Sequence, residues 1–265
     1  MRTGRRSSAG LRIDGEMMTA KWEVSDTETA VSDTCERSGA SAHKCVRCHA
    51  QGRCVLESLS SQSRDTLKFH LRENQVGDGS TIFAQDEPAH RLHVVKSGAV
   101  LVCHRSISGP AIPVGFFGPG IALGKLAPFA EHDHVFSAVS VGSSRICSVS
   151  TQVLRSQPQI QRELAQALPE SLLRFQREMA AWSVIARMGN LQDRLAQALQ
   201  QLARSQRSNR VQLPPHRVLA ALLGTTRESV ARTLARMRTL RHLESAGHKH
   251  VQLGPQLELS APLLE

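Results

Sequence analysis

Hydrophobic residues follow no regular period over residues 1–34, and periodic patterns begin only further along the chain. This first stretch is rich in Ser, Thr, Gly, Arg and acidic residues, a composition that predicts a disordered leader. A cysteine-bearing segment follows over residues 35–54. After it, apolar positions at helical spacing predict a short amphipathic helix over residues 60–73.

Residues 76–150 carry a different pattern, in which short apolar runs alternate with Gly and Pro. Clear examples are the runs at 81–83, 92–95 and 99–102. Short, closely spaced strands with turn residues between them are typical of an antiparallel barrel or sandwich.

Helical periodicity takes over after residue 157. Pro158 can open a first helix that runs through Leu168, and Pro169 stands at a favoured first-turn position of a second helix. Apolar residues spread around much of the second helix, over 170–188, so this helix is either buried between domains or paired with its copy in another subunit. We favour pairing. Gly189 and Asn190 interrupt the pattern, and residues 191–204 then predict another amphipathic helix.

The last third of the chain predicts two short helices joined by a turn. The first covers residues 215–223, Gly224 makes the turn, and Thr225 with Glu228 forms a capping box for the second helix. Val230, Leu234 and Met237 are spaced to face a core, whereas Arg227, Glu228, Ala231 and Arg232 fall on the other face.

Residues 243–253 then resemble a small β-hairpin, or wing. Two helices around a Gly-containing turn, with charged residues early on the second, are the arrangement by which a helix-turn-helix reads the major groove. An ordinary solvated helix is the alternative, and the cap, turn and hairpin together favour DNA binding.

The formal net charge of +10 favours a polyanionic partner, although a membrane surface would satisfy it equally well. The chain has no apolar run of about 18 residues, the length needed to span a membrane. Arg2, Arg5 and Arg6 precede no apolar segment, so no secretory signal is expected and the chain is predicted to be cytoplasmic. Aromatic residues are only 3%, and Tyr is absent, so groove and phosphate contacts are favoured over base stacking.

Three of the six cysteines, Cys45, Cys48 and Cys54, lie within ten residues, and Cys147 follows at the end of an expected strand. In a reducing compartment such clustering favours metal binding or redox sensing over structural disulfides. Cys35 and Cys103 fall outside this pattern, and Cys103 is expected in a core.

The cysteine pattern admits alternatives. Cys45, Cys48 and His49 match the haem c attachment motif, which the absence of an export signal disfavours. Zinc could be held by the thiols with His43 or His49, and the thiols could also act in redox chemistry without a metal.

Two segments resemble the Crp/Fnr family of transcriptional regulators, with a match that covers roughly Cys45 to the end of the chain. Residues 79–83 followed by 92–98 are similar to the family's barrel signature, and residues 226–232 resemble its recognition helix. The resemblance implies an α+β chain with an N-terminal jelly-roll β-barrel of the cyclic-nucleotide-binding type, a long dimerisation helix and a C-terminal winged helix-turn-helix. We therefore expect a leader over 1–34, a sensor domain over 35–154, a dimerisation region over 155–189 and a DNA-binding domain over 190–265.

The cysteines are similar to those of the family's oxygen-responsive iron–sulfur branch. That resemblance implies a [4Fe–4S] cluster held by Cys45, Cys48, Cys54 and Cys147. Cyclic-nucleotide binders of the family carry an acidic residue and a following Arg-Ser or Arg-Thr pair, but this chain has Lys125 at the acidic position and no such pair. Cyclic nucleotide binding is therefore not expected.

The resemblance assigns DNA contacts to Thr226, Arg227, Glu228 and Arg232. The iron–sulfur branch usually has Glu-x-x-Ser-Arg on this helix, whereas here Arg227 precedes Glu228 and Ala231 replaces the serine. This pattern is closer to that of the cAMP receptor protein, so a palindromic site with TGTGA-like half-sites is predicted instead of TTGAT. Arginine can pair bidentately with guanine, and glutamate can accept from cytosine.

The expected partners are double-stranded DNA, RNA polymerase and a second copy of the chain, with the cluster favouring dimerisation when oxygen is low. No enzyme activity is predicted. His132, Asp133 and His134 form the best candidate catalytic group, but they lack partners at motif spacing and are expected to lie in a solvated turn.

Overall fold

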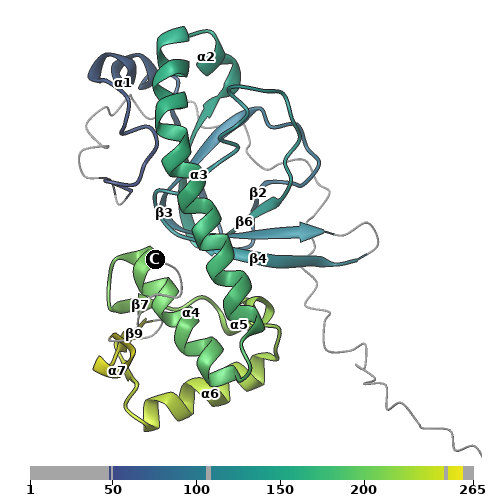
Figure 1. Cartoon of the computed structure of the whole chain (residues 1–265), viewed down its shortest axis with the longest axis vertical. Coiled ribbons are helices and arrows are strands. Elements are labelled where there is room, and N and C mark those ends of the chain that lie inside the picture. Colours follow the sequence, from purple (N-terminus) through teal and green to yellow (C-terminus); the bar gives the residue numbers. More distant parts are fainter. Residues whose placement is uncertain (1–47, 49, 106–108, 248–249, 259–265) are drawn as a thin grey trace, which may run out of the picture.

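The computed structural model describes residues 48, 50–105, 109–247 and 250–258 (Figure 1). The expected leader, Cys35, His43, Cys45 and His49 lie outside the described residues.

The N-terminal domain is built on a six-stranded antiparallel sheet with the path β1-β6-β3-β4, on which β2 pairs with β6 and β5 with β3. The long strands β3 and β6 run side by side and form its centre. A short helix, α1, Ser61–Leu67, precedes it and is capped by the Ser60 hydroxyl. The strands are β1 Arg72–Val76, β2 Thr81–Phe83, β3 Arg91–Arg105, β4 Ala111–Phe117, β5 Ala122–Leu123 and β6 Ser137–Ser150.

Two local expectations about this domain were wrong. The helix expected over 60–73 stops at Leu67, because Arg72–Val76 pairs with β6 instead. The apolar runs at 92–95 and 99–102 belong to one strand, since Gly98 at φ +79° lets β3 continue through an irregularity in its pairing.

Two helices follow the sheet, the short α2, Thr151–Arg155, and the long α3, Pro158–Arg187. The expected break at Pro169 does not occur. Pro169 and Ala165 are both exposed, so the carbonyl that loses its intrahelical partner can be solvated by water. The helix crosses from the sheet to the C-terminal domain (Figure 1).

The C-terminal domain has the expected winged-helix order. Helix α4, Leu191–Gln206, is capped by Asn190 and leads into the strand β7, Arg210–Gln212, which pairs with the second strand of the wing. The remaining elements are α5 His216–Leu222, α6 Arg227–Thr239, β8 Leu243–Ser245, β9 His250–Leu253 and α7 Pro255–Glu258.

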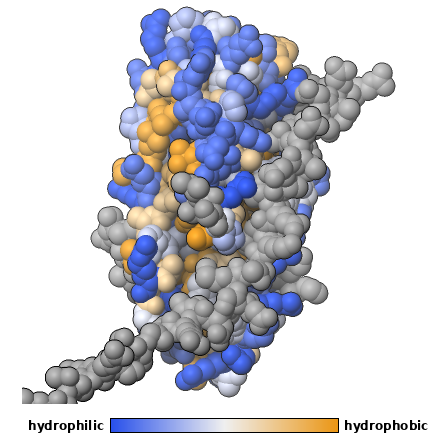
Figure 2. Space-filling view, turned by 90° about the vertical axis from the view of Figure 1, so that its right-hand side faces the viewer, coloured by the Kyte–Doolittle hydropathy of each residue, from blue (hydrophilic) through white to orange (hydrophobic). Residues whose placement is uncertain are grey.

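One hydrophobic core joins both domains. Leu101 and Phe116 of the sheet pack with Trp182 of α3 and with the buried faces of α4, α5 and α6. A second core lies where Val55 and the outer face of β3 and β6 meet α3. A third fills the space among the strands and includes Phe83 and Phe117. Outside these cores, the face in Figure 2 carries hydrophobic patches between hydrophilic residues.

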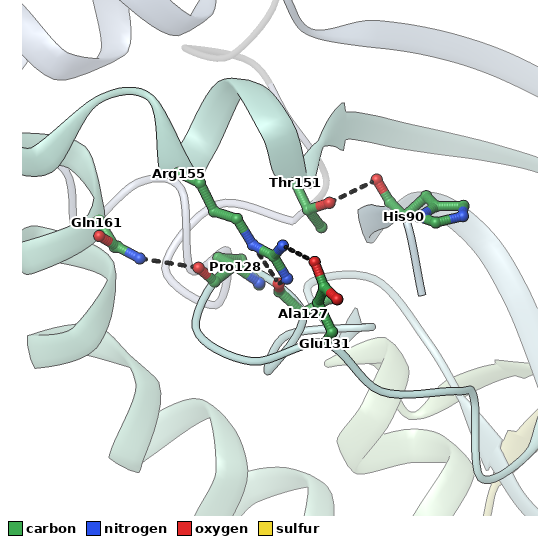
Figure 3. Close-up of polar contacts among 7 residues, drawn as sticks. All are labelled: His90, Ala127, Pro128, Glu131, Thr151, Arg155 and Gln161. Carbon is green, nitrogen blue, oxygen red and sulfur yellow. Dashed lines mark hydrogen bonds and ion pairs between the residues drawn. The ribbon is translucent and has the colours of Figure 1, made fainter. Parts of the chain in front are cut away.

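The loop after β5 is tied to the helices by polar contacts (Figure 3). The Arg155 guanidinium donates to the Ala127 carbonyl at 2.6 Å and to the Glu131 carboxylate at 3.0 Å, and Gln161 donates to the Pro128 carbonyl at 2.9 Å. These contacts hold the segment that contains Lys125 against α2 and α3. No helix among the described residues has the length and apolar character needed to cross a membrane.

Candidate DNA-binding surface and cysteine site

The N-cap of helix α6 is Thr226, one residue later than the predicted Thr225. The Thr226 hydroxyl, not that of Thr225, accepts from the Ser229 backbone N–H at 3.2 Å. Gly224 makes the preceding turn at φ +60°, with open space around the position of a Cβ. The cap satisfies one of the helix's unpaired N–H groups and orients its first turn.

The two faces of α6 divide as predicted. Val230, Leu234 and Met237 are fully buried in the shared core, whereas Arg227, Glu228 and Arg232 are exposed. Arg232 also donates to the Ser229 hydroxyl at 3.3 Å, which holds its side chain along the helix. The structure thus presents the predicted base-reading groups together on one solvent-facing surface.

Positive charge surrounds this surface. His216, at the start of α5, has its pKa lowered by burial and by the nearby Arg227 and Arg238. Arg236 and Arg238, in the last turn of α6, and Arg241, just after it, are also exposed. These positive charges attract the phosphate groups of DNA but do not distinguish one base sequence from another.

Three of the predicted cysteine ligands lie in the same region of the structure. Cys147 is half-buried on β6, opposite Glu73 of β1 and Val94 of β3. Cys54 packs with Cys147 against the same core. Burial, together with Glu73, Cys54 and Cys48, raises the pKa of the Cys147 thiol to about 12, while Lys96 lowers it. The fourth predicted ligand, Cys45, lies outside the described residues.

A charged pair borders these thiols and was missed by sequence reasoning. Lys96 is buried, and its ammonium donates to the Glu73 carboxylate at 2.5 Å. Burial lowers the pKa of Lys96, but the bond to Glu73 and the fields of Glu73, Cys147 and Cys48 raise it overall. No local pattern signals this pair, because it depends on the irregularity in β3 after Val95 and on the register of β1 with β6.

The three described thiols differ from a formed metal site. Soft thiolates that crowd a half-buried site repel each other when ionised, and both a metal cation and the Lys96 ammonium would offset that charge. Among the described residues, no group of three or more His, Cys, Asp or Glu side chains is placed so that it could hold a metal ion, and Cys45 lies outside them. Cys103 lies apart from the site and is 1% exposed in the shared core, as expected.

Lys125, which the sequence resemblance aligns with the acidic residue of cyclic-nucleotide binders, is held inside the structure. It is buried, and its ammonium donates to the Ser171 carbonyl of α3 at 3.1 Å and lies 4.5 Å from the centre of the Phe175 ring. Burial lowers its pKa to about 8. Lys125 therefore connects the barrel to α3.

The predicted solvated turn at 132–134 is only partly solvated. His134 is buried and stacks on Phe83 with ring centroids 3.8 Å apart, while Asp133 is exposed. His93 also lies near the Phe83 ring, at 5.5 Å. His134 was expected in solvent but is part of the packing among the strands, because the loop folds back to hydrogen-bond with residues 86–89.

A cyclic-nucleotide-type barrel that is joined by a long helix to a winged helix defines a class of DNA-binding regulators. Comparisons with known families agree: residues 73–159 match the cyclic nucleotide-binding domain, and residues 193–254 match the Crp-like helix-turn-helix domain. The chain belongs to the Crp/Fnr family of transcriptional regulators and is a Crp-like DNA-binding regulator.

Curated relatives share this organisation. A CRP-like cAMP-activated global transcriptional regulator of Mycobacterium tuberculosis is 27% identical over 68% of this chain and 84% of its own length. The cyclic AMP receptor protein of Thermus thermophilus is 26% identical over 69% of this chain and 85% of its own.

Solved structures show the same fold. FixK2 from Bradyrhizobium japonicum superposes with a TM-score of 0.57 at 22% identity, covering 71% of this chain and 96% of its own. The c-di-GMP responsive global regulator CLP of Xanthomonas campestris gives a TM-score of 0.54 at 19% identity, covering 73% and 99%.

Proposed function

We propose that this regulator senses oxygen or redox state through a [4Fe–4S] cluster held by Cys45, Cys48, Cys54 and Cys147. The single observation that supports the proposal is that Cys48 and Cys54 lie close enough to Cys147, which is far away in the sequence, to act on the pKa of its thiol. A chance arrangement of cysteines would not be expected to bring the strand thiol to the loop thiols.

The chain's own residues have distinct roles in this proposal. Cys147 is a rigid ligand on a central strand, and the loop cysteines approach it from the segment before α1. Lys96, fixed by Glu73, places a positive charge beside the thiolates and so lowers the cost of ionising them. When bound, such a cluster supplies oxygen-sensitive iron–thiolate bonds.

Dimerisation through α3 completes the proposal. Leu173, Ala180 and Val184 are exposed and spaced along one face of the helix, and Leu173 and Val184 are 45% and 42% exposed. Spacing of seven and four residues is suited to pairing with a second copy. A dimer would place two copies of α6 on the two halves of a palindromic DNA site, where RNA polymerase is the expected partner.

The decisive experiment is purification under strict anaerobiosis, followed by iron and acid-labile sulfide assays and an absorbance spectrum before and after exposure to air. About four irons and four sulfides per chain, with bleaching in air, are expected. The variant Cys147→Ser should lose most of its iron, whereas Cys103→Ala, which removes a thiol outside the site, should keep it. Iron-free wild-type protein that still binds DNA would refute the cluster and leave a Crp-like regulator that responds to thiol oxidation, zinc or a small molecule.

DNA selectivity is a separate part of the proposal. Arg227 and Arg232 read guanines, Glu228 reads a cytosine, and Thr226 fixes the start of the helix, on TGTGA-like half-sites. Arg227→Ala should cost about 1–3 kcal/mol of discrimination at one base pair. Arg187→Ala, a control at the end of α3, should leave selectivity unchanged. Site selection from random DNA that returns TTGAT half-sites would contradict this assignment.

The barrel is proposed to work without a cyclic nucleotide, although its domain family and the curated relatives point to one. Support comes from Lys125, which bonds to α3 where an acidic group would be required. Calorimetric titration of the full chain with cAMP and cGMP should give no heat of binding. Saturable binding of either nucleotide would assign the signal to the barrel.

A further inference from the structure

Arg53 lies beside Cys54 and contacts the DNA-binding domain directly. Its two terminal nitrogens donate to the Ser205 and Arg204 carbonyls, each at 2.9 Å. These carbonyls belong to the last turn of α4, where carbonyls run out of helical N–H partners, although the Arg204 carbonyl also accepts from the Arg207 backbone N–H at 3.3 Å. A guanidinium at this place acts as a two-pronged C-terminal cap and also complements the helix dipole.

The backbone of the same segment is held from two further sides. Arg174 of α3 donates to the Arg53 carbonyl at 2.7 Å, and Arg207, which ends α4 at φ +51°, donates to the Gln51 carbonyl at 3.3 Å. The cysteine segment, α3 and the end of α4 are thus joined through four hydrogen bonds around Arg53.

The turn between β4 and β5 packs against this junction. A Cβ at Gly120 would lie 2.4 Å from Arg53 Cβ, and a Cβ at Gly118 would lie 2.5 Å from Ser205 Oγ. Both positions leave no room for a side chain without movement. The barrel therefore fits closely against Arg53 and against the residue that it caps.

Most of the charged groups at this junction are positive. Burial, followed by the field of Arg207, lowers the pKa of Arg53, and Glu178 of α3 raises it. Burial raises the pKa of the Glu178 carboxyl against the opposing fields of Arg53 and Arg174. Arg53, Arg174 and Lys125 thus all act on the one carboxyl group of Glu178.

We propose that Arg53 is the positioning residue that transmits a change at Cys48 and Cys54 to the DNA-binding domain. A rearrangement of these cysteines moves the adjacent Arg53, which withdraws its cap from α4. Helix α4 continues through β7 to the recognition helices, so loss of the cap loosens the orientation of α6. The inference deepens the proposed function, because it takes these cysteines as the sensing residues.

The first test needs no iron. Hydrogen exchange is measured on the full chain over residues 203–212, before and after alkylation of the reduced thiols with iodoacetamide. In the wild type, alkylation should speed exchange several-fold. In Arg53→Ala, exchange should be fast beforehand and unchanged by alkylation. Arg204→Ala, which removes a neighbouring charge but keeps the accepting carbonyl, should behave like the wild type. No change in the wild type, or a full change in Arg53→Ala, would overturn the proposal.

The second test measures DNA affinity of anaerobic and air-exposed protein on the same site. For Arg53→Ala the ratio of the two affinities should fall to about one while iron content stays near the wild-type value. A wild-type ratio in this variant would overturn the role of Arg53. Absence of iron from the wild type would instead refute the cluster, and the exchange measurement would still decide the role of Arg53.

Discussion

Thr226 shows how a single side chain decides where the recognition helix starts. Thr225 and Thr226 are adjacent, and both precede acidic or hydroxyl residues at capping distance. The backbone of Thr226 has φ −92° and ψ 154°, the extended conformation of an N-cap, and its hydroxyl accepts from Ser229. Choosing between the two threonines requires the geometry of the turn at Gly224.

Replacing Thr226 with Ala should therefore lower the free energy of unfolding by about 1 kcal/mol, the usual cost of losing an N-cap. Thr225→Ala, which removes no capping bond, is the matched control and should change stability much less. Urea denaturation followed by circular dichroism measures both. Equal losses in the two variants would argue against the cap at Thr226.

His93 and His134 make the stability of the N-terminal domain sensitive to acid. Burial, followed by the fields of His134 and Arg91, lowers the pKa of His93 to about 3, and burial also lowers the pKa of His134 to about 4. Each histidine is neutral in the folded state and gains a proton more readily when unfolded. Their contribution to stability is complete above the unfolded pKa near 6.5 and is lost as the pH falls towards the folded values.

The free energy of unfolding should thus decline steadily below pH 6.5, by roughly 2 kcal/mol for His93 alone at about pH 5. Denaturation midpoints measured from pH 7 to pH 5 test this. His93→Leu should flatten the pH dependence, while His104→Leu, on the same strand but with an exposed side chain, should not. An unchanged slope in His93→Leu would contradict the assignment.

At the scale of elements, α3 combines an internal proline with two different faces. Its inward face places Trp182 and Ile185 in the shared core, and the Trp182 indole N–H donates to the Phe116 carbonyl at 3.0 Å. Its outward face leaves Leu173 and Val184 exposed. Because the inward residues hold the helix along its length, Pro169 need not end it.

Val184→Glu should shift the protein towards the monomer, because it places a carboxylate in the proposed contact between two copies of α3. Sedimentation velocity at several protein concentrations measures the shift. Ser183→Glu, one position away on the helix, should have a smaller effect. A wild-type protein that is monomeric at all concentrations would rule out this interface under those conditions.

At the scale of the molecule, the barrel and the winged helix share one core and are not joined only by a linker. Leu101, Phe116 and Val141 of the sheet pack with residues of α4 to α6. Arg217 of α5 pairs with Asp78 between β1 and β2 at 3.1 Å, a surface contact that adds little stability by itself. The shared hydrophobic surface is the main link.

We expect both domains to unfold in one transition for this reason. Helix content measured by circular dichroism and the fluorescence of Trp182, in a Trp22→Phe background, should change at the same denaturant concentration. Two separated midpoints would mean that the shared core contributes little to cooperativity.

The sequence by itself determined the winged helix in most respects. The spacing of Val230, Leu234 and Met237, the turn at Gly224 and the hairpin that follows are local signals, set by helix geometry and by backbone sterics within a few residues. The same local rules placed Arg227, Glu228 and Arg232 on the exposed face. They also indicated a strand-rich sensor domain, although not that two of its apolar runs are one strand.

Only the tertiary structure decided how the N-terminal domain is assembled. The register of β1 and β3 with β6 brings Glu73 and Lys96 to Cys147, and chain folding brings Cys48 and Cys54 there as well. Lys125 turns to α3, and Arg53 reaches the end of α4. Each of these contacts joins residues far apart in the chain, so no local period or propensity encodes it. They form because burying the shared apolar surface fixes the strands and helices against one another.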